Sequence, residues 1–247
     1  MTNTTKTSVL VTGGNKGLGL ETARRLGELG WTVFLGSRDE DRGRAAADKL
    51  AADGVDVVMV PLDVTSDASV AAAVPLVRAH TDRLDVLVNN AGAPGRVVPP
   101  ADATVDDIYP VYDTNVFGPI RVTHAFLPLL EAADNPRVVM VSSGGGSFSV
   151  VTDPEQPVSK MHELAYSTSK AALNMITVRY AQALPRIKFN AITPGETANH
   201  KFAATDMNNH TGALTVTEGT DVIVRLATIG PDGPTGTFSD RLGPVGW

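Results

Sequence analysis

The 247-residue chain contains no cysteine. This absence excludes disulfides, thiolate metal sites and cysteine nucleophiles, and it is typical of a protein from a reducing compartment. The chain also lacks any run of about 18 apolar residues, so the sequence predicts no membrane span. Its N-terminus has no apolar stretch of the length found in secretory signals. We therefore expect a soluble, cytoplasmic protein.

Positive charge is also scarce. The 21 Lys and Arg residues are outnumbered by 27 Asp and Glu, and the net charge is -6. Proteins that bind nucleic acids or anionic membranes need clustered Lys and Arg, so we expect neither as a partner. The five histidines are scattered, and no pair has the spacing of a metal site, so we expect no metal. The sequence lacks the G-x-S-x-G motif of hydrolases that use a Ser/His/Asp triad, so we do not expect that chemistry.

Short β-branched apolar runs alternate with longer helical stretches along the chain. The runs are apolar at every position, which is typical of strands that helices cover on both faces. This alternation predicts a single-domain, Rossmann-like, doubly wound parallel α/β sheet of about seven strands over residues 1–247. The expected strands are Ser8–Thr12, Trp31–Leu35, Val55–Leu62, Leu84–Val88, Arg137–Val141, Ile187–Ile192 and Thr237–Phe238. The expected helices are Leu18–Leu29, Glu40–Ala52, Asp67–Thr81, Val105–Asn115, Gly118–Ala133, Leu164–Leu184 and Thr217–Ile229.

Two stretches, Ser147–His162 and Glu196–Ala213, are predicted to be irregular. Both follow expected strands, at the edge where open α/β sheets bind ligands. We expect the first to cap the active site and the second, which is polar, to form the substrate loop. Phe148, Met161 and Phe202 are equally compatible with lining the pocket and with packing.

A glycine-rich loop with the sequence TGGNKGLG joins the first expected strand to the first helix. Glycines permit a tight turn and a close approach of the backbone to a pyrophosphate, and a helix N-terminus offers N–H groups to the anion. The spacing G-x-x-x-G-x-G differs from the usual dinucleotide fingerprint, but its place after the first strand predicts cofactor binding. The cofactor residues expected here are Gly13, Asn15, Lys16, Gly17, Leu18 and Gly19.

The end of the second expected strand bears on the choice of cofactor. An acidic residue there would hold the ribose 2′-hydroxyl of NAD, but Gly36 and Ser37 are not acidic. Arg38 offers a guanidinium to a 2′-phosphate, and Lys16 offers a second cation. Asp39 is the alternative ribose ligand, although its acidic neighbours favour a helix start at this point. We predict NADP(H).

Tyr166 and Lys170 stand four residues apart in an expected helix, so they share one face. A nearby ammonium favours tyrosinate, and we expect it to lower the pKa of Tyr166 from about 10. A general acid or base works best with a pKa near the working pH. The pair therefore predicts proton transfer to or from a carbonyl or alcohol oxygen, although Y-x-x-x-K by itself is a common pattern.

Together these motifs resemble the short-chain dehydrogenase/reductase family, and in particular its carbonyl-reductase-like members. Six landmarks recur in order along almost the whole chain, which makes the resemblance far more specific than any single motif. They are TGGNKGLG, Asn89-Asn90-Ala91-Gly92, Asn115, Ser142-Ser143, Tyr166-Ser167-Thr168-Ser169-Lys170 and Pro194-Gly195.

The resemblance implies a role for each catalytic residue. It makes Tyr166 the general acid/base and Lys170 a ligand of the nicotinamide ribose. It makes Ser143 the residue that holds the substrate oxygen, with Ser142 as the alternative serine. Asn115 is implied to hold a water that relays protons to the lysine. An Asn inside a helix is unfavourable by propensity, which agrees with such a purpose.

The resemblance also implies cofactor contacts outside the glycine loop. Asp63 is implied to contact the adenine, and Asn90 to support the sheet beside the cofactor. Thr197 departs from the usual spacing, because relatives carry a threonine a little further on. The implied contacts are Arg38, Asp63, Val64, Asn90, Ala91, Gly92, Tyr166, Lys170, Pro194, Gly195 and Thr197.

The sequence thus predicts an NADP(H)-dependent oxidoreductase that reduces an aldehyde, ketone or quinone to an alcohol by hydride transfer. The alternatives are a secondary-alcohol dehydrogenase, a dehydratase or epimerase on the same fold, and a cofactor-sensing protein without catalysis. Between Ser143 and Tyr166 lie 22 residues, more than in many relatives. Because this insert can disturb the surface through which relatives form tetramers, a monomer, a dimer and a tetramer are all compatible with the sequence.

Overall fold

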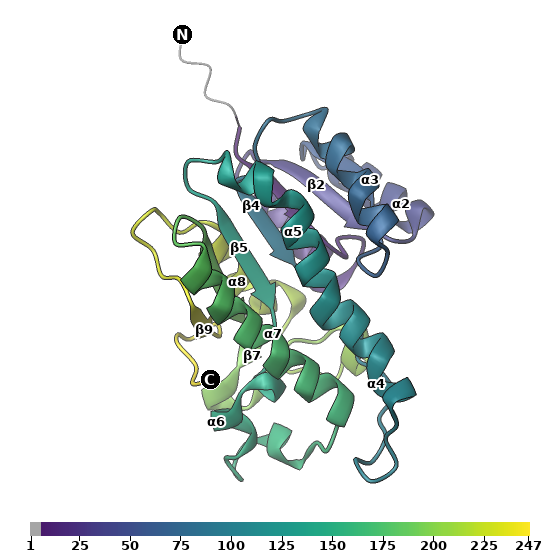
Figure 1. Cartoon of the computed structure of the whole chain (residues 1–247), viewed down its shortest axis with the longest axis vertical. Coiled ribbons are helices and arrows are strands. Elements are labelled where there is room, and N and C mark those ends of the chain that lie inside the picture. The colour runs from purple at the N-terminus through teal and green to yellow at the C-terminus, as the bar shows by residue number, and fades with distance from the viewer. Residues whose placement is uncertain (1–5) are drawn as a thin grey trace.

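The computed structural model describes residues 6–247, apart from the side chain of Asp206. Seven parallel strands form one sheet in the order β3-β2-β1-β4-β5-β6-β9 (Figure 1). This arrangement confirms the predicted doubly wound parallel sheet. The strands are β1 (Ser8–Val11), β2 (Thr32–Ser37), β3 (Val57–Pro61), β4 (Val86–Asn89), β5 (Arg137–Val141), β6 (Lys188–Ile192) and β9 (Thr237–Ser239).

Helices cover both faces of the sheet, and each face has its own apolar core. Leu10 packs with α3, α5 and α7, whereas its neighbours Val9 and Val11 pack with α1, α2 and α8. All three side chains are fully buried, which explains why the strands are apolar throughout. Within residues 6–247 no helix is both long and apolar enough to cross a membrane. The long helices are α1 (Gly17–Glu28), α2 (Glu40–Ala52), α3 (Asp67–Arg78), α4 (Val105–Tyr112), α5 (Gly118–Glu131), α7 (Leu164–Ala183) and α8 (Val216–Ala227).

The helices α4 and α5 form one continuous helical stretch, which Figure 1 shows running along the front of the sheet. They are joined by a π-helical turn, Asp113–Phe117, rather than by a loop. In this turn the Gly118 N–H donates to the Asp113 carbonyl, five residues earlier. Such widened turns occur often at functional sites, and the sequence analysis did not predict this one.

The insert Ser147–His162 is partly ordered into short elements. These are a 3-10 turn at Gly144–Gly146 just before it, α6 (Phe148–Val151) and a second 3-10 turn at Pro157–Lys160. Its first residues are fastened to the end of the chain, because the Ser147 hydroxyl donates to the Gly246 carbonyl at 2.7 Å. Trp247 in turn stacks on Phe238 of β9, with ring centroids 5.6 Å apart.

The predicted substrate loop is also ordered, and we call residues 195–214 the substrate segment. It opens with an antiparallel pair, β7 (Gly195–Glu196) and β8 (Lys201–Phe202), and has 3-10 turns at Thr197–Asn199 and Asp206–Asn208. Its last residue returns to its middle, where the Ala204 N–H donates to the Leu214 carbonyl at 2.8 Å. The expectation of an irregular stretch is therefore wrong here, because the backbone closes its own hydrogen bonds.

Candidate active site

The candidate site lies at the carboxyl ends of the strands, around β1, β4 and β5. The chain runs outward from β1 to β2 and β3, and then returns to place β4 on the other side of β1. Open α/β sheets bind their ligands at this reversal of strand order, because the two loops diverge and leave a crevice. The predicted glycine loop follows β1, and Asn90, Ala91 and Gly92 follow β4.

The glycine loop has a shape that side chains would prevent. Gly13 and Gly17 adopt φ angles of 62° and 53°, a region that L-residues rarely enter. A Cβ on Gly19 would collide with the Gly13 carbonyl and the Asn90 side chain. The loop and the end of β4 are therefore in direct contact.

Thr12 and Asn90 bind these two segments together. The Asn90 amide donates to the carbonyls of Thr12 and Gly13, at 2.9 and 3.1 Å. The backbone N–H groups of Asn90 and Ala91 both donate to the Thr12 hydroxyl at 3.0 Å. The sequence analysis assigned no role to Thr12. The available signal was a small hydroxyl residue at a strand end, directly before glycines.

The residues at the start of α1 fit a pyrophosphate. The helix begins at Gly17, the preceding Lys16 provides no side-chain cap, and the first turn contains no acidic residue. The N–H groups and the positive end of the helix dipole therefore face the glycine loop without a competing carboxylate. Asn15 and Leu18 lie in the same loop and first turn, and both are partly buried.

The end of β2 offers an exposed cation and no acidic side chain of its own. Gly36 and Ser37 are buried, and Arg38 is exposed. Asp39 caps α2 by accepting the Arg42 N–H at 3.0 Å. This cap confirms the predicted helix start and engages the carboxylate that was the alternative ribose ligand.

Asp63 and Val64 follow β3, further along the same edge of the sheet. Asp63 accepts hydrogen bonds from the N–H and hydroxyl of Thr65, at 3.0 and 2.8 Å. Val64 is buried and packs where Gly118 begins α5. Both residues thus have local structural roles, and the predicted adenine contact stays a prediction.

Three predicted residues meet beside β4. A Cβ built on Gly92 would lie 3.5 Å from the Asn115 side-chain oxygen and 3.7 Å from the Lys170 ammonium nitrogen. The same position would lie 3.7 Å from the Met207 methyl group. The substrate segment therefore reaches over this point through Met207, which the sequence analysis did not single out.

Asn115 lies in the π-helical turn and is almost fully buried. Its side chain accepts from the Ala93 N–H at 2.8 Å, and it donates to the Ala93 carbonyl and the Ser169 hydroxyl at 2.9 and 3.0 Å. The side chain therefore connects the β4 loop to α7. Pro119, four residues later, has no N–H to donate to the Asn115 carbonyl in the α-helical pattern.

The two serines after β5 have different partners. The Ser142 hydroxyl donates to the Lys170 carbonyl of α7 at 3.3 Å and is buried. The Ser143 hydroxyl accepts from the Gly145 N–H at 3.2 Å, and its interaction with Tyr166 acts to lower the pKa of that phenol. Gly146 leaves no room for a Cβ against the α7 backbone at Lys170, so the turn after Ser143 packs directly on the helix.

Lys170 and Tyr166 have perturbed protonation equilibria. The ammonium of Lys170 donates to the Val141 carbonyl at 2.9 Å, and burial lowers the pKa of this lysine to about 8. Burial raises the pKa of Tyr166 to about 12, and the hydrogen bond with Ser143 acts in the opposite direction. The predicted lowering of the Tyr166 pKa is therefore wrong for this structure. The ammonium lies 5.5 Å from the ring centroid, and loss of hydration dominates.

Pro194, Gly195 and Thr197 follow β6 at the same edge. A Cβ on Gly195 would collide with the Lys201 carbonyl, so the β7–β8 pair requires glycine there. Thr197 lies next to the Ser143 turn, because its methyl group is 3.7 Å from the Cβ position of Gly144. Of the three residues, Thr197 thus borders the turn that carries the serine.

Large apolar side chains are exposed on the segments that flank this region. Phe148, Met161, Phe202 and Met207 expose between 39% and 73% of their surface. Each of the first three is thus only partly packed within the chain, and pocket lining by them stays a prediction.

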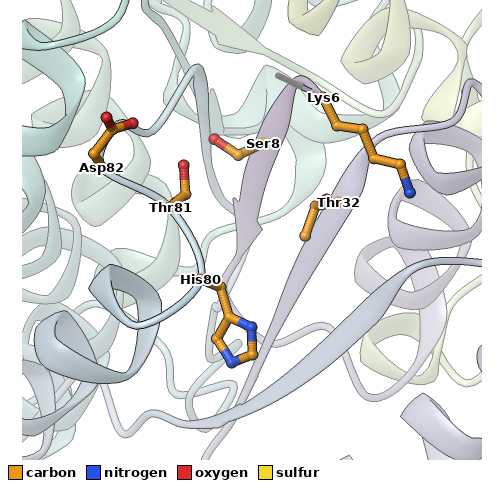
Figure 2. A pocket seen from close by; sticks show the side chains of 6 residues that line it. All are labelled: Lys6, Ser8, Thr32, His80, Thr81 and Asp82. Carbon is orange, nitrogen blue, oxygen red and sulfur yellow. The ribbon is translucent and has the colours of Figure 1, made fainter. Parts of the chain in front are cut away.

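A separate cavity of about 410 Å³ lies at the opposite edge of the sheet (Figure 2). Ser8 and Thr32 open β1 and β2 there, and both hydroxyls are already bonded, to the Arg83 carbonyl and to Asp56. This cavity lies at the amino ends of the strands, away from the residues described above.

Comparison with known proteins agrees with this geometry. A sequence model of the family described as short chain dehydrogenase matches residues 7–211. The chain belongs to the short-chain dehydrogenase family. It is 33% identical to (-)-isopiperitenone reductase of Mentha piperita, over 94% of this chain and 95% of that protein.

Solved structures of short-chain dehydrogenases superpose on most of the chain. NADPH-bound carbonyl reductase from chicken fatty liver is 30% identical, with a TM-score of 0.84 over 98% of this chain and 100% of that one. Salutaridine reductase from Papaver somniferum is 28% identical, with a TM-score of 0.80 over 94% of this chain and 99% of that one. The Rossmann-like sheet predicted from the sequence is thus confirmed.

Proposed function

We propose that this short-chain dehydrogenase is an NADP(H)-dependent carbonyl reductase. The observation that carries the proposal is that Ser143, Tyr166 and Lys170 lie together at the edge of the sheet that also carries the glycine loop. In this proposal Tyr166 is the general acid/base, Ser143 binds the substrate oxygen, and Lys170 binds the nicotinamide ribose. The partner is a small carbonyl or alcohol compound.

The arrangement suits the chemistry of carbonyl reduction. NADPH, when bound, supplies the hydride that reduces the carbonyl carbon. The oxygen then gains negative charge, which a hydrogen bond from Ser143 stabilises. Tyr166 donates its phenolic proton to that oxygen, and in the oxidative direction the tyrosinate takes the proton back. The raised pKa of Tyr166 keeps the phenol protonated and ready for the reductive direction.

A proton path from Tyr166 to solvent is part of the proposal. The Asn115 carbonyl lacks the α-helical N–H that Pro119 cannot supply, so its oxygen suits a water molecule. The Asn115 side chain and the Lys170 ammonium both border Gly92, which supports a path between the two residues. The water and the ammonium would return a proton to Tyr166 after each reduction.

Two observations support NADP(H) as the cofactor. The end of β2 offers the exposed Arg38, while Asp39 is engaged as the cap of α2. The solved carbonyl reductase that superposes on 98% of the chain is described as NADPH-bound. We assign Lys16 and Arg38 to the 2′-phosphate and the glycine loop to the pyrophosphate. The chain is further proposed to act in the cytoplasm, in keeping with the absence of cysteine.

The remaining cofactor contacts follow the ends of the strands. Asp63 and Val64 are assigned to the adenine side, and the residues after β4 and β6 to the nicotinamide side. Thr197 borders the serine turn, which supports a place near the nicotinamide for Thr197 and for its neighbours Pro194 and Gly195. The nicotinamide-side residues after β4 are Asn90, Ala91 and Gly92.

The test is NADPH and NADH oxidation with a panel of aldehydes, quinones and cyclic ketones, including menthone and salutaridine. Turnover with NADPH on any of them supports the proposal. NADPH binding in calorimetry without turnover on the panel favours the cofactor-sensing alternative. Turnover only of alcohols with the oxidised cofactor favours the secondary-alcohol dehydrogenase.

A further inference from the structure

The start of the substrate segment is held by a turn that follows β9, Asp240–Gly243. Asp240 is almost fully buried, with 2% of its surface exposed. Its carboxylate accepts the Thr197 N–H and hydroxyl through one oxygen, at 2.8 and 2.7 Å. The other oxygen accepts the N–H groups of Leu242 and Gly243, at 2.8 and 3.0 Å. All four partners are donors, which suits a carboxylate and not an amide.

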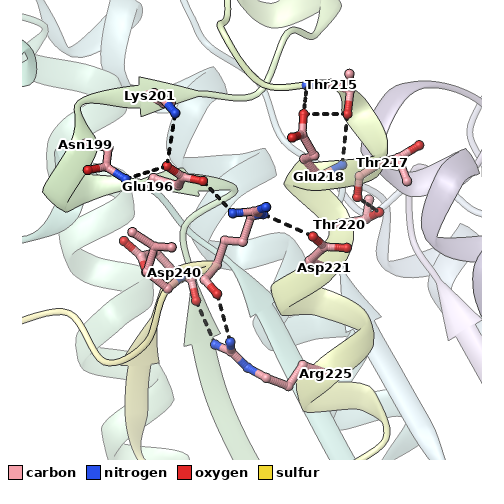
Figure 3. Close-up of polar contacts among 12 residues, drawn as sticks. Glu196, Asn199, Lys201, Thr215, Thr217, Glu218, Thr220, Asp221, Arg225 and Asp240 are labelled. Carbon is pink, nitrogen blue, oxygen red and sulfur yellow. Dashed lines mark hydrogen bonds and ion pairs between the residues drawn. The ribbon is translucent and has the colours of Figure 1, made fainter.

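A second contact holds the same turn to the segment. Arg241 forms an ion pair with the buried Glu196 at 2.6 Å and another with Asp221 of α8 at 3.2 Å; Figure 3 labels these two carboxylates. Arg225 of α8 donates to the Asp240 carbonyl at 2.7 Å. The turn is therefore fixed to α8 on one side and to the substrate segment on the other.

The hydroxyl of Thr197 is oriented by this arrangement. Because its proton is donated to Asp240, its remaining lone pairs are left to accept a hydrogen bond. Thr197 lies beside the Ser143 turn, and the Gly144 N–H donates to the hydroxyl of Thr193 at 3.0 Å. The residue that carries this oriented hydroxyl thus borders the Ser143 turn through its methyl group.

We propose that Asp240 is a positioning residue that acts through Thr197. It fixes the Thr197 hydroxyl as an acceptor for an N–H donor, the group that the nicotinamide carboxamide carries. This inference rests on the proposed function for its kinetic test. It assigns a role to a residue 43 positions further along the chain, outside the matched region 7–211.

A double-mutant cycle tests whether the two residues act as one unit. Thr197→Val removes the hydroxyl and keeps the side-chain shape, and Asp240→Asn replaces one acceptor oxygen by a donor. We expect each change to lower kcat/KM for NADPH about 10-fold, the effect of one lost hydrogen bond to a ligand. The double variant should be no worse than the poorer single variant. Losses that multiply would overturn the proposal.

Thr197→Ser keeps the hydroxyl and should stay within a few-fold of the wild type. Thr32→Val is the matched control, because the Thr32 hydroxyl donates to Asp56 at 2.8 Å at the opposite edge of the sheet (Figure 2). It should leave kcat/KM unchanged. If Asp240→Asn does not fold, wild-type kcat/KM in Thr197→Val still overturns the proposal, and a loss that Thr197→Ser restores supports it.

Calorimetric NADPH affinity separates this inference from the proposed function. If the wild type turns over none of the carbonyl compounds, the proposed function is contradicted, but the role of Asp240 is not. The same cycle is then measured on the dissociation constant of NADPH, where non-additive losses support the role of Asp240 and additive losses overturn it. Hydrogen exchange gives a third measurement, since Asp240→Asn should raise exchange in residues 195–202 and leave β5 and β6 protected. If hydrogen exchange in residues 195–202 is unchanged, Asp240 does not stabilise the start of the substrate segment.

Discussion

Lys170 lies over the ring of Tyr166, 5.5 Å from its centroid, while its ammonium donates to the Val141 carbonyl at the end of β5. The lysine is thus held by the sheet and not by the tyrosine hydroxyl. Ser143 acts on the tyrosine instead, in the direction that lowers the pKa of Tyr166. The proposed acid/base residue therefore interacts with the residue proposed to bind the substrate oxygen. Lys170 instead binds the backbone at the end of β5.

Tyr166→Phe should lower kcat by about 10²- to 10⁴-fold, because the proton donor is lost while the ring stays in place. The dissociation constant of NADPH should change by no more than a few-fold. Tyr180→Phe, in the same helix, is the control, since Tyr180 stacks on Phe189. Steady-state kinetics and calorimetry measure both effects, and near-normal turnover in Tyr166→Phe would exclude the assigned role.

Replacing Ser143 and replacing Ser142 should have different effects on turnover and on stability. Ser143→Ala should lower kcat by about 10²- to 10³-fold, because it removes a donor to the developing negative charge. Ser142→Ala breaks the bond to the Lys170 carbonyl and should mainly lower the free energy of unfolding, by about 1 kcal/mol. Turnover and urea unfolding are measured on both variants. The opposite ranking of kcat would assign the substrate contact to Ser142.

Lys170 should make stability depend on pH. Burial lowers its pKa from 10.5 to about 8, so between these values the unfolded chain holds a proton that the folded chain lacks. The free energy of unfolding should therefore rise from pH 8 to pH 10. Above pH 10 the raised pKa of Tyr166 acts in the opposite direction. Lys170→Met should remove the rise in urea titrations, whereas the exposed Lys49→Met should keep it.

Arg38→Asp should move cofactor preference from NADPH towards NADH. The change removes a cation for the 2′-phosphate and adds a carboxylate that suits the ribose 2′-hydroxyl. The ratio of kcat/KM for the two cofactors measures the shift. Arg44→Asp, an exposed change on α2, is the control. An unchanged ratio in Arg38→Asp would place the phosphate contact elsewhere.

Gly19→Ala should weaken NADPH binding at least 10-fold by calorimetry, on the order of one disrupted anion contact. The added methyl group would collide with the Gly13 carbonyl and displace the loop from Asn90. Gly230→Ala is the matched control, because its Cβ would have no atom within 4 Å. Equal affinities in the two variants would contradict a close approach of this backbone to the cofactor.

Local patterns in the sequence predicted the elements that depend on local physics. The strands around Leu10 and Val139 are apolar throughout, and the helix cap at Asp39 follows from its own neighbours. The π-helical turn around Asn115 was missed because an Asn within a helical pattern gives no sign of an extra residue in the turn. Pro119, four residues later, was the available clue.

Contacts between distant parts of the chain could not be predicted from local sequence patterns. The raised pKa of Tyr166 depends on how deeply α7 packs, which the spacing to Lys170 does not reveal. The bond between Thr197 and Asp240 joins two segments whose local sequences give no sign of each other. The order of the substrate segment depends in part on this distant contact, since Asp240 holds the segment at Thr197.

The two separate cores bear on how this chain can be altered. The helix that would hold the pyrophosphate, α1, rests on the core of Val9 and Val11, while α7 with its tyrosine and lysine rests on the core of Leu10. Among the described residues, the sheet lies between these two cores. Arg38 stands just before α2, and the proton-transfer residues belong to α7, so the two helices concerned pack in different cores. A change of cofactor preference at Arg38 is expected to leave the geometry around Tyr166 and Lys170 unchanged.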